Sequence, residues 1–315
     1  MFTRRGVIKA VDGVSFDLSP GETLGIVGES GSGKSTLALS IMRQVPRPTA
    51  RIVGGSILLE GQDLLALSEA RMRALRGSRI SMILQDPQAS LNPVFTIGSQ
   101  VSDVIAAHTG HARPPAVWQR AVQALKRVRI PEPERRMLNF PHQMSGGMKQ
   151  RVVGAMTLWG GPRVLIADEP TTALDATIQA QYLRLLKDLQ QAAGTAIVFI
   201  THDLGIVARM CDRVAVMYAG RIVEQASAAD LLEHPRHPYT RALLASVPRM
   251  SGPIDELRPI DGQPPDLAAL PVGCHFAPRC PLADEQCASV YPATSVCGDE
   301  HLVACWHADA VGNRR

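Results

Sequence analysis

A glycine-rich segment near the N-terminus constrains the fold of this chain more than any other feature. Residues 28–36 contain the pattern G-x-x-x-x-G-K-S/T followed by Thr36, with a predicted strand at residues 24–27 before the loop and a predicted helix at residues 34–42 that leaves it. In that order the three elements make a phosphate-binding loop, because backbone amides and the N-terminus of the helix attract anionic oxygens. The predicted nucleotide-binding residues are Gly28, Glu29, Ser30, Gly31, Ser32, Gly33, Lys34, Ser35 and Thr36.

The chemistry expected of this loop is that of a nucleoside triphosphate with its metal ion. Lys34 is expected to reach the β and γ phosphates, and the Ser35 hydroxyl to coordinate Mg²⁺. A glycine-rich turn without a ligand is the alternative, and the strand–loop–helix context argues against it.

Composition excludes several classes of protein. Hydrophobic residues make up 45% of the chain and charged residues 20%, as in a soluble globular protein with a sizeable core. The apolar runs fall short of the ~20 residues that span a bilayer, and no secretory signal is visible, so we expect a cytoplasmic protein. The net charge of +4 is spread over interspersed acids and bases, and only 4% of residues are aromatic, so we expect no nucleic-acid partner.

Two adjacent carboxylates follow an apolar run at residues 164–167. Such a run predicts a strand buried on both faces of a parallel sheet, as does the run at residues 197–201. Asp168 is expected to hold Mg²⁺, and Glu169 to polarise the attacking water as a general base. Paired acids also occur as the solvated end of a strand, but the phosphate loop upstream favours the hydrolytic role.

A third segment, residues 144–151, reads Met-Ser-Gly-Gly-Met-Lys-Gln-Arg. It resembles the signature of the ABC ATPase family, with methionine in place of the usual leucine. The resemblance implies that the signature of one subunit closes on ATP held by the phosphate loop of another. Amides at the start of a helix suit such an anion physically. The residues implied to contact the nucleotide are Ser145, Gly146, Gly147 and Gln150.

Other motifs of the ABC family follow in the expected order. Gln85 resembles the Q-loop glutamine, which senses Mg²⁺ and the attacking water, and His202 resembles the switch histidine at the γ-phosphate. Asp175, in Ala-Leu-Asp at residues 173–175, resembles the D-loop. The resemblance also implies an aromatic side chain on the adenine, for which Phe2 is the candidate. The complete set implies Mg²⁺-dependent ATP hydrolysis.

Four segments resemble one group within the ABC family, the ATPases of dipeptide and oligopeptide permeases, and especially their D-type subunit. These segments are residues 85–93, 140–145, 174–181 and 237–244. This resemblance implies a peptide importer with a paralogous ATPase subunit, two transmembrane permease subunits and an extracytoplasmic solute-binding protein. The chain would then lie at the cytoplasmic face of the membrane. Nickel or glutathione as the solute, and a soluble ABC ATPase acting on nucleic acid or ribosomes, are the alternatives.

Five of the six cysteines lie after residue 273, which marks a second module. Their surroundings resemble the C-terminal extension of the permease family, which implies a 4Fe-4S cluster held by thiolates. Structural zinc remains an alternative ligand, and a redox-sensing role is a further possibility. Cys297 is an additional thiol and leaves the identity of one ligand open. The four implied ligands are Cys274, Cys280, Cys287 and Cys305.

The predicted architecture is therefore α/β. It comprises an ABC ATP-binding domain at residues 1–250 with a helical insertion at about 90–160, a linker at residues 251–270, and a small cysteine-rich module at residues 271–315. Within the first domain we also expect a strand at residues 214–218 and helices at residues 228–233 and 240–247.

Overall fold

The computed structural model describes residues 1–3, 6–86, 90–110, 115–172, 174–246, 259–298 and 300–312. The chain divides into two compact units. Unit 1 comprises Met1–Asp17, Thr23–Gly55 and Ile200–Arg315, and unit 2 comprises Leu18–Glu22 and Ser56–Phe199. Within the described residues, no helix is long and apolar enough to cross a membrane.

The strands of unit 1 follow the order β11-β12-β10-β9-β3. Strand β3 (Thr23–Val27) is buried at every position and runs parallel to β9 (Arg213–Tyr218), while β10 (Arg221–Ser227) is antiparallel to β9. Short runs of β-branched and aliphatic residues explain β3 and β9, which are buried at nearly every position. The expected strands at residues 24–27 and 214–218 are confirmed.

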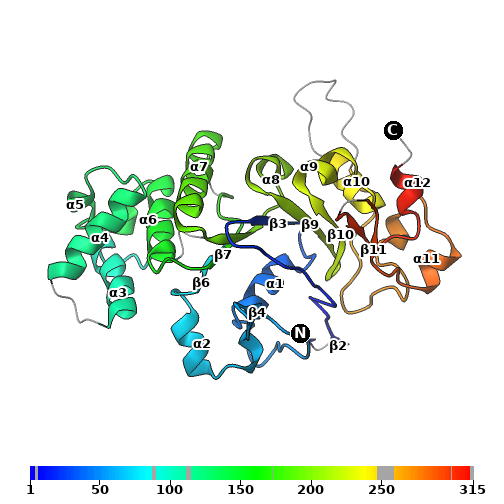
Figure 1. Cartoon of the computed structure of the whole chain (residues 1–315), viewed down its shortest axis with the longest axis horizontal. Helices are drawn as coiled ribbons and strands as arrows, with labels where there is room; N and C mark the ends of the chain where they lie inside the picture. Colours follow the sequence, from blue (N-terminus) through cyan, green and yellow to red (C-terminus); the bar gives the residue numbers. More distant parts are fainter. Residues whose placement is uncertain are drawn as a thin grey trace. The chain divides into compact units, whose positions relative to one another are not determined.

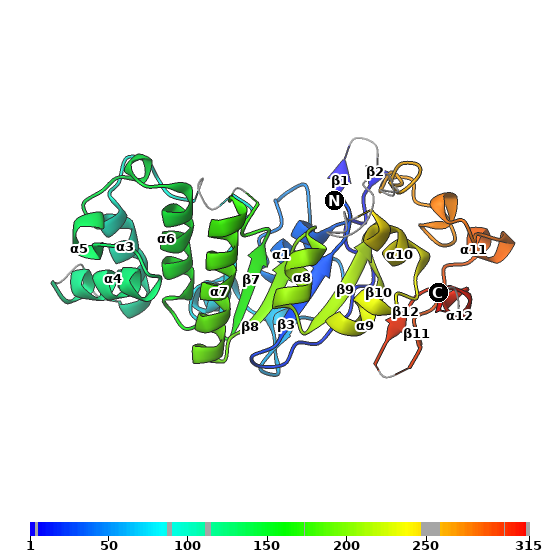
Figure 2. The same cartoon turned by 90° about the horizontal axis from the view of Figure 1, so that it is seen from above.

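Several helices of unit 1 lie beside these strands (Figure 2). They are α1 (Lys34–Ile41), α8 (Leu204–Met210), α9 (Ala228–Glu233) and α10 (Pro238–Ala245). Asp203, Ser227 and His237 cap the last three, each side chain accepting a backbone N–H of the first turn. The expected helix at residues 228–233 is confirmed, and the one expected at residues 240–247 begins at Pro238 instead.

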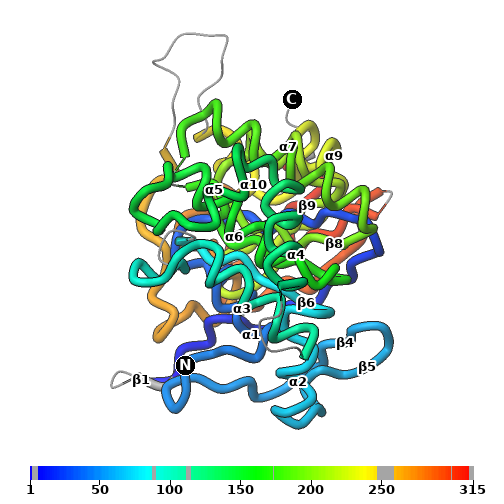
Figure 3. The backbone as a smooth tube through the Cα atoms, turned by 90° about the vertical axis from the view of Figure 1, so that its left-hand side faces the viewer, coloured from blue at the N-terminus to red at the C-terminus, as the bar shows by residue number. Residues whose placement is uncertain are grey.

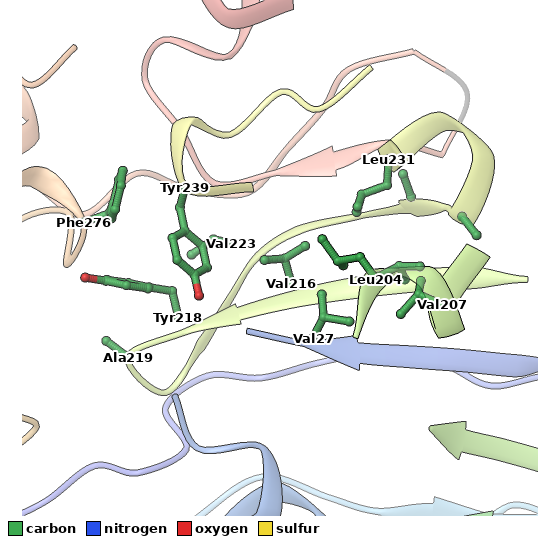
Figure 4. Close-up of a cluster of buried hydrophobic side chains, with 13 residues drawn as sticks. Val27, Leu204, Val207, Val216, Tyr218, Ala219, Val223, Leu231, Tyr239 and Phe276 are labelled. Carbon is green, nitrogen blue, oxygen red and sulfur yellow. The ribbon is translucent and has the colours of Figure 1, made fainter. Parts of the chain in front are cut away.

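A buried apolar cluster in unit 1 joins β3, β9, α8 and α9 (Figure 4). Val27, Val216 and Leu231 are each fully or almost fully buried in it. At one end of the cluster Tyr218, Tyr239 and Phe276 pack together, with ring centroids 4.5 to 5.4 Å apart. Phe276 comes from the cysteine-rich segment, so that segment shares the buried core beside β3 and β9.

The C-terminal segment also extends the sheet of unit 1 (Figure 1). Strand β12 (Leu302–Val303) pairs antiparallel with β10, and β11 (Ser295–Val296) pairs with β12. The segment also contains η4 (Ala277–Arg279), α11 (Glu285–Ser289) and α12 (Ala308–Gly312). The domain boundaries predicted from the sequence remain predictions, and part of the linker, residues 251–258, lies outside the described residues.

Unit 2 has the strand order β8-β7-β6. Strands β6 (Ile80–Ile83) and β7 (Val164–Asp168) are parallel, with Ile83 opposite Ala167. Strand β8 (Ala196–Ile200) follows the long helix α7 (Ala176–Ala193). A small hairpin, β4 (Leu58–Leu59) and β5 (Gln62–Asp63), leads through η1 (Leu64–Ala66) into α2 (Glu69–Leu75) (Figure 3).

The helical part of unit 2 contains α3 (Ile97–Thr109), α4 (Pro115–Arg127), α5 (Pro133–Arg136) and α6 (Gly146–Leu158), with η2 (Pro141–Gln143) before α6. Helices α3 and α4 pack on each other and on α6 (Figure 1). The described residues between 90 and 160 form no strand, as the sequence predicted.

Candidate active site

Two glycines of the phosphate loop are required for two reasons: their φ angles are positive, and other backbone segments lie too close to leave room for a side chain. Gly28 has φ 152° and Gly33 has φ 105°. A Cβ on Gly28 would overlap the Met217 carbonyl oxygen, and a Cβ on Gly33 would overlap that of Ala10. The loop is therefore wedged between the end of β9 and the N-terminal segment, and any side chain at either position would displace it.

Lys34 is the first residue of α1 and its side chain turns back across the loop. It is 7% exposed, and its Nζ donates to the carbonyl oxygens of Gly28 at 2.7 Å and Glu29 at 2.9 Å. Ser35 and Thr36 follow in the first turn of α1, with Ser35 exposed. The predicted phosphate-binding lysine is therefore buried, and its ammonium group bonds to the backbone of the phosphate loop itself.

Glu29 connects this loop to the C-terminal segment. Its backbone N–H donates to the Tyr239 hydroxyl at 2.8 Å. Its carboxylate accepts two bonds from Arg279, at 2.7 Å and 3.1 Å. Sequence reasoning missed Arg279. The only signal was an arginine directly before Cys280 in the run that carries the first two cysteines.

Four polar side chains lie at or just after the ends of β6 and β7 in unit 2. Asp168 is 3% exposed at the last position of β7, and Glu169 follows with φ 45°, a costly conformation for a residue with a side chain. Glu169 Oε2 accepts from the Thr172 hydroxyl at 2.9 Å and lies 3.4 Å from Gln85 Nε2. Two motifs far apart in sequence therefore meet here, and the carboxylate is held by neighbouring donors.

The signature segment opens α6. Ser145 is the N-cap, and its hydroxyl accepts the Met148 N–H at 3.4 Å. A Cβ on Gly147 would crowd Ile178 of α7, so glycine is needed there for packing between helices. Gln150 is 1% exposed and donates to the Pro170 carbonyl oxygen at 2.6 Å. Its side chain therefore ties α6 to the segment that follows β7, a contact that the sequence did not predict.

The remaining predicted site residues fall at the ends of elements. Asp175 caps α7 by accepting the N–H groups of Thr177 and Ile178. His202 is exposed between β8 and α8. The backbone of Phe2 pairs with Val7 in a two-residue ladder between β1 (Phe2–Thr3) and β2 (Gly6–Val7). The Phe2 side chain and Ala173 of the D-loop lie outside the described residues.

The four predicted cysteine ligands are close enough to interact electrostatically. Burial raises the pKa of the Cys305 thiol to about 12, and the charges of the other three cysteines contribute in the same direction. Cys280 Sγ accepts the Leu282 N–H at 3.4 Å, and Cys305 Sγ accepts the His307 N–H at 3.3 Å. Backbone donors aimed at sulfur suit thiolate ligands, because they stabilise the deprotonated form.

Two other groups border these thiols. Cys297 follows β11, with its Sγ 3.9 Å from the Ser295 hydroxyl. Asp284, Cys287 and His307 bring one potential ligand atom each to within 4.8 Å of one another. The C-terminal segment therefore offers two overlapping donor sets that share Cys287, one of four thiols and one of mixed chemistry.

Comparison with known proteins supports this architecture. Residues 11–172 match the family described as "ABC transporter", and residues 223–287 match "Oligopeptide/dipeptide transporter, C-terminal region". The chain is 53% identical over 313 residues to "Probable peptide ABC transporter ATP-binding protein y4tR" of Sinorhizobium fredii (strain NBRC 101917 / NGR234), covering 99% of this chain and 93% of the relative. It is 49% identical over 307 residues to "Dipeptide transport ATP-binding protein DppD" of Bacillus subtilis (strain 168), covering 98% and 91%.

A solved structure is also similar, the dimeric post-hydrolysis state of the ATP-binding cassette MJ0796 bound to ADP and Pi. It has a TM-score of 0.60 and 27% identity, and the match covers 70% of this chain and 90% of that one. The phosphate loop and the strand-end carboxylates define a P-loop ATPase. The chain belongs to the ABC transporter ATP-binding family, in the group that carries the oligopeptide/dipeptide transporter C-terminal region.

Proposed function

We propose that this protein hydrolyses ATP to energise an ABC importer of dipeptides or oligopeptides. The observation that carries the proposal is the match of residues 223–287 to the oligopeptide/dipeptide transporter C-terminal region, on a chain that also matches the ABC transporter family. Two relatives that align along nearly the whole chain are named for peptide and dipeptide transport.

The residues of the loop bind the phosphates in this proposal. Lys34 neutralises the β and γ phosphates, for which it exchanges its bonds to the Gly28 and Glu29 carbonyl oxygens. Ser35, Asp168 and Gln85 hold Mg²⁺, which supplies charge neutralisation at the phosphate oxygens. Asp168 supplies a carboxylate at the last position of β7, and carboxylate oxygens are ligands that Mg²⁺ prefers.

Glu169 is the proposed general base for the attacking water. Its bonds to Thr172 and Gln85 fix the direction of the carboxylate, and its strained backbone indicates a position held by its surroundings. His202 contacts the γ-phosphate in the same proposal. Phe2 is the candidate for stacking on the adenine.

A second ATPase subunit completes each site. Ser145, Gly146 and Gly147 present the start of α6 to the nucleotide of the partner, and Asp175 lies in the loop that contacts the partner. Gln150 supports this surface from beneath through its bond to Pro170. The solved dimeric cassette supports a dimer, and we propose that the partner here is a paralogue. Two transmembrane subunits and an extracytoplasmic binding protein complete the importer, with this chain peripheral at the cytoplasmic face.

The C-terminal thiols Cys274, Cys280, Cys287 and Cys305 are the proposed ligands of a 4Fe-4S cluster. The donor set fits, because four thiols interact electrostatically and backbone N–H groups point at two of the sulfurs. Such a cluster would cross-link a segment that has few regular elements. Zinc is the competing ligand, and the Asp284, Cys287 and His307 group gives it a second donor set.

The solute is tested by uptake in a strain that lacks this gene. We expect loss of labelled dipeptide or longer-peptide uptake, restored by the wild-type gene, with labelled glutathione and nickel uptake unchanged. Loss of glutathione or nickel uptake alone would show that the peptide assignment is wrong.

A further inference from the structure

Arg279 is the most completely bonded cation in the C-terminal segment that the structure describes. Its side chain is 4% exposed. Nη1 donates to Glu29 Oε2 at 2.7 Å and to the Tyr218 hydroxyl at 3.2 Å, and Nη2 donates to Glu29 Oε1 at 3.1 Å. Nη2 also donates to the Ile260 carbonyl oxygen at 3.3 Å, and Nε to that of Asp261 at 2.9 Å. All five N–H donors of a guanidinium are therefore used.

Two aromatic rings also lie close to the same guanidinium. Its Cζ lies 5.9 Å from the centroid of the Tyr218 ring and 5.8 Å from that of Phe276. Both distances are within the range of cation–π attraction. Figure 4 shows these two rings with Tyr239 at one end of the apolar cluster. The position of Arg279 is thus fixed by packing as well as by hydrogen bonds.

Glu29 connects Arg279 to the phosphate loop. Arg279 holds its carboxylate, and the Tyr239 hydroxyl accepts its backbone N–H. The Glu29 carbonyl oxygen in turn accepts the Lys34 ammonium at 2.9 Å and the Ser32 N–H at 3.2 Å. A continuous chain of contacts therefore runs from the residue before Cys280 to the lysine that binds phosphate.

We propose that Arg279 is a positioning residue for ATP binding, which fixes the phosphate loop through Glu29 and makes the loop sensitive to the cysteine site beside it. This inference rests on the proposed ATPase function and adds a role for the C-terminal segment. Because Arg279 is covalently next to Cys280, a change in how Cys280 is held moves the guanidinium. Glu29 then loses its anchor, and the loop binds nucleotide less well.

Arg279 bonds to both carboxylate oxygens of Glu29, so we predict that a positive charge at position 279 is not enough to hold Glu29 in place. Lysine keeps the positive charge at position 279 but has one nitrogen and cannot form the fork with both Glu29 oxygens. The Tyr239 bond to the Glu29 backbone remains in every Arg279 variant, so the loop loosens without losing its fold. The effect therefore falls on ATP affinity, and the chemistry at Glu169 stays intact.

The test measures fluorescent-ATP affinity, KM for ATP and kcat on the assembled transporter. We expect Arg279→Gln and Arg279→Lys each to raise Kd and KM about tenfold, as for loss of a charge-assisted hydrogen bond, with kcat within about twofold. Glu29→Gln should have a similar effect from the other side of the contact. The double variant should be no worse than either single change, because both remove one interaction. Arg73→Gln, at an exposed arginine on α2, is the matched control and should leave Kd unchanged.

A second experiment tests whether Cys280 affects ATP binding through Arg279. It measures only the Kd for ATP. Cys280→Ser should raise the Kd for ATP to the level of Arg279→Gln, and the combined variant should add nothing. Cys297→Ser should behave as wild type. Additive losses for Cys280 and Arg279, or equal losses for Cys280 and Cys297, would overturn the link.

The outcomes separate this inference from the proposed function. A wild-type complex that binds no ATP would refute the ATPase function itself. Wild-type ATP binding with unchanged affinity in both Arg279→Gln and Glu29→Gln would overturn the inference and leave the function standing. A fall in kcat at unchanged KM would also overturn it. If Arg279→Gln does not fold, Glu29→Gln tests the same contact from within the loop.

Discussion

Gln85 and Glu169 lie side by side although 84 positions separate them in the chain, with Gln85 Nε2 3.4 Å from Glu169 Oε2. Parallel pairing of β6 with β7 produces this contact, since the carboxyl ends of parallel strands meet at one edge of a sheet. The Thr172 hydroxyl donates to the same Glu169 oxygen at 2.9 Å. The glutamine thus helps to orient the proposed general base.

Replacement of Gln85 should slow hydrolysis more than it weakens binding. We expect Gln85→Ala to lower kcat about tenfold to a hundredfold, because the base loses a neighbour that orients it and the attacking water loses a contact. Phosphate release under saturating ATP measures this. Gln123→Ala, at an exposed glutamine on α4, is the control, and equal rates for the two variants would contradict the role.

The elements that hold this site differed in how well the sequence predicted them. The strands ending at Val27 and Asp168 were correctly expected, because each is a short apolar run beside a motif. Strand β6 was missed, since Ile80–Ile83 contains a serine and has no motif before it. Helix α7 was not predicted, although Asp175 is a favourable N-cap residue at its start.

The phosphate loop gives a second prediction. Gly33→Ala should abolish measurable ATP binding, because its Cβ would meet the Ala10 carbonyl oxygen at a φ of 105°. Gly61→Ala is the matched control, since Gly61 also has positive φ, has open space around the position of a Cβ, and lies outside the phosphate loop. Calorimetry of ATP binding to the two folded variants makes the comparison. Equal affinities would show that the close approach to Ala10 is unimportant.

A third prediction concerns the attachment of the C-terminal hairpin. His301 is 1% exposed, with Nε2 2.7 Å from Glu224 Oε1 and Nδ1 2.6 Å from Asp230 Oδ2. Burial lowers the pKa of His301, but hydrogen bonds and charges of Glu224 and Asp230 outweigh it and raise the pKa above the ordinary 6.5. The protonated ring therefore bridges β10 and α9.

The sign of the pH effect follows from this raised pKa. The stabilisation is fully present below about pH 6.5 and is lost as the pH rises through the folded-state pKa. We expect His301→Gln to lower the free energy of unfolding by about 3 kcal/mol at pH 6 and by less at pH 9, since it leaves buried Glu224 without its cation. Denaturant titrations at both pH values test this, with exposed His234→Gln as the control. A loss that is the same at both pH values would contradict a charged His301.

The cysteine site gives a fourth prediction. Serine at any one of Cys274, Cys280, Cys287 or Cys305 should remove most of the bound metal, whereas Cys297→Ser should keep it. Anaerobic purification followed by absorption spectra and iron, sulfide and zinc analysis measures the content. Zinc without iron would show that the cluster assignment is wrong. Loss of metal in His307→Ala at intact thiols would instead favour the mixed donor set.

Contacts made by the C-terminal segment were beyond what the sequence could predict. The clustered cysteines and the family resemblance indicated a metal-binding module, but neither placed Phe276 in the core of the nucleotide-binding sheet. The bond from Arg279 to Glu29 joins positions that are 250 residues apart. Long-range contacts of this kind depend on the pairing of β12 with β10, which places the C-terminal segment beside the sheet. No local pattern in the sequence predicts that pairing.

ATP-driven peptide accumulation by the complete transporter, reconstituted in vesicles with Glu169→Gln in place of wild type, tests the central claim most directly. We expect the variant to bind ATP with near-normal affinity, because the Glu169 carboxylate is not a phosphate ligand. Steady-state hydrolysis and peptide accumulation should both fall by more than about a hundredfold, because the water loses its general base. Unchanged hydrolysis in this variant would show that Glu169 is not the general base, and unchanged accumulation would show that its ATP hydrolysis does not drive peptide import.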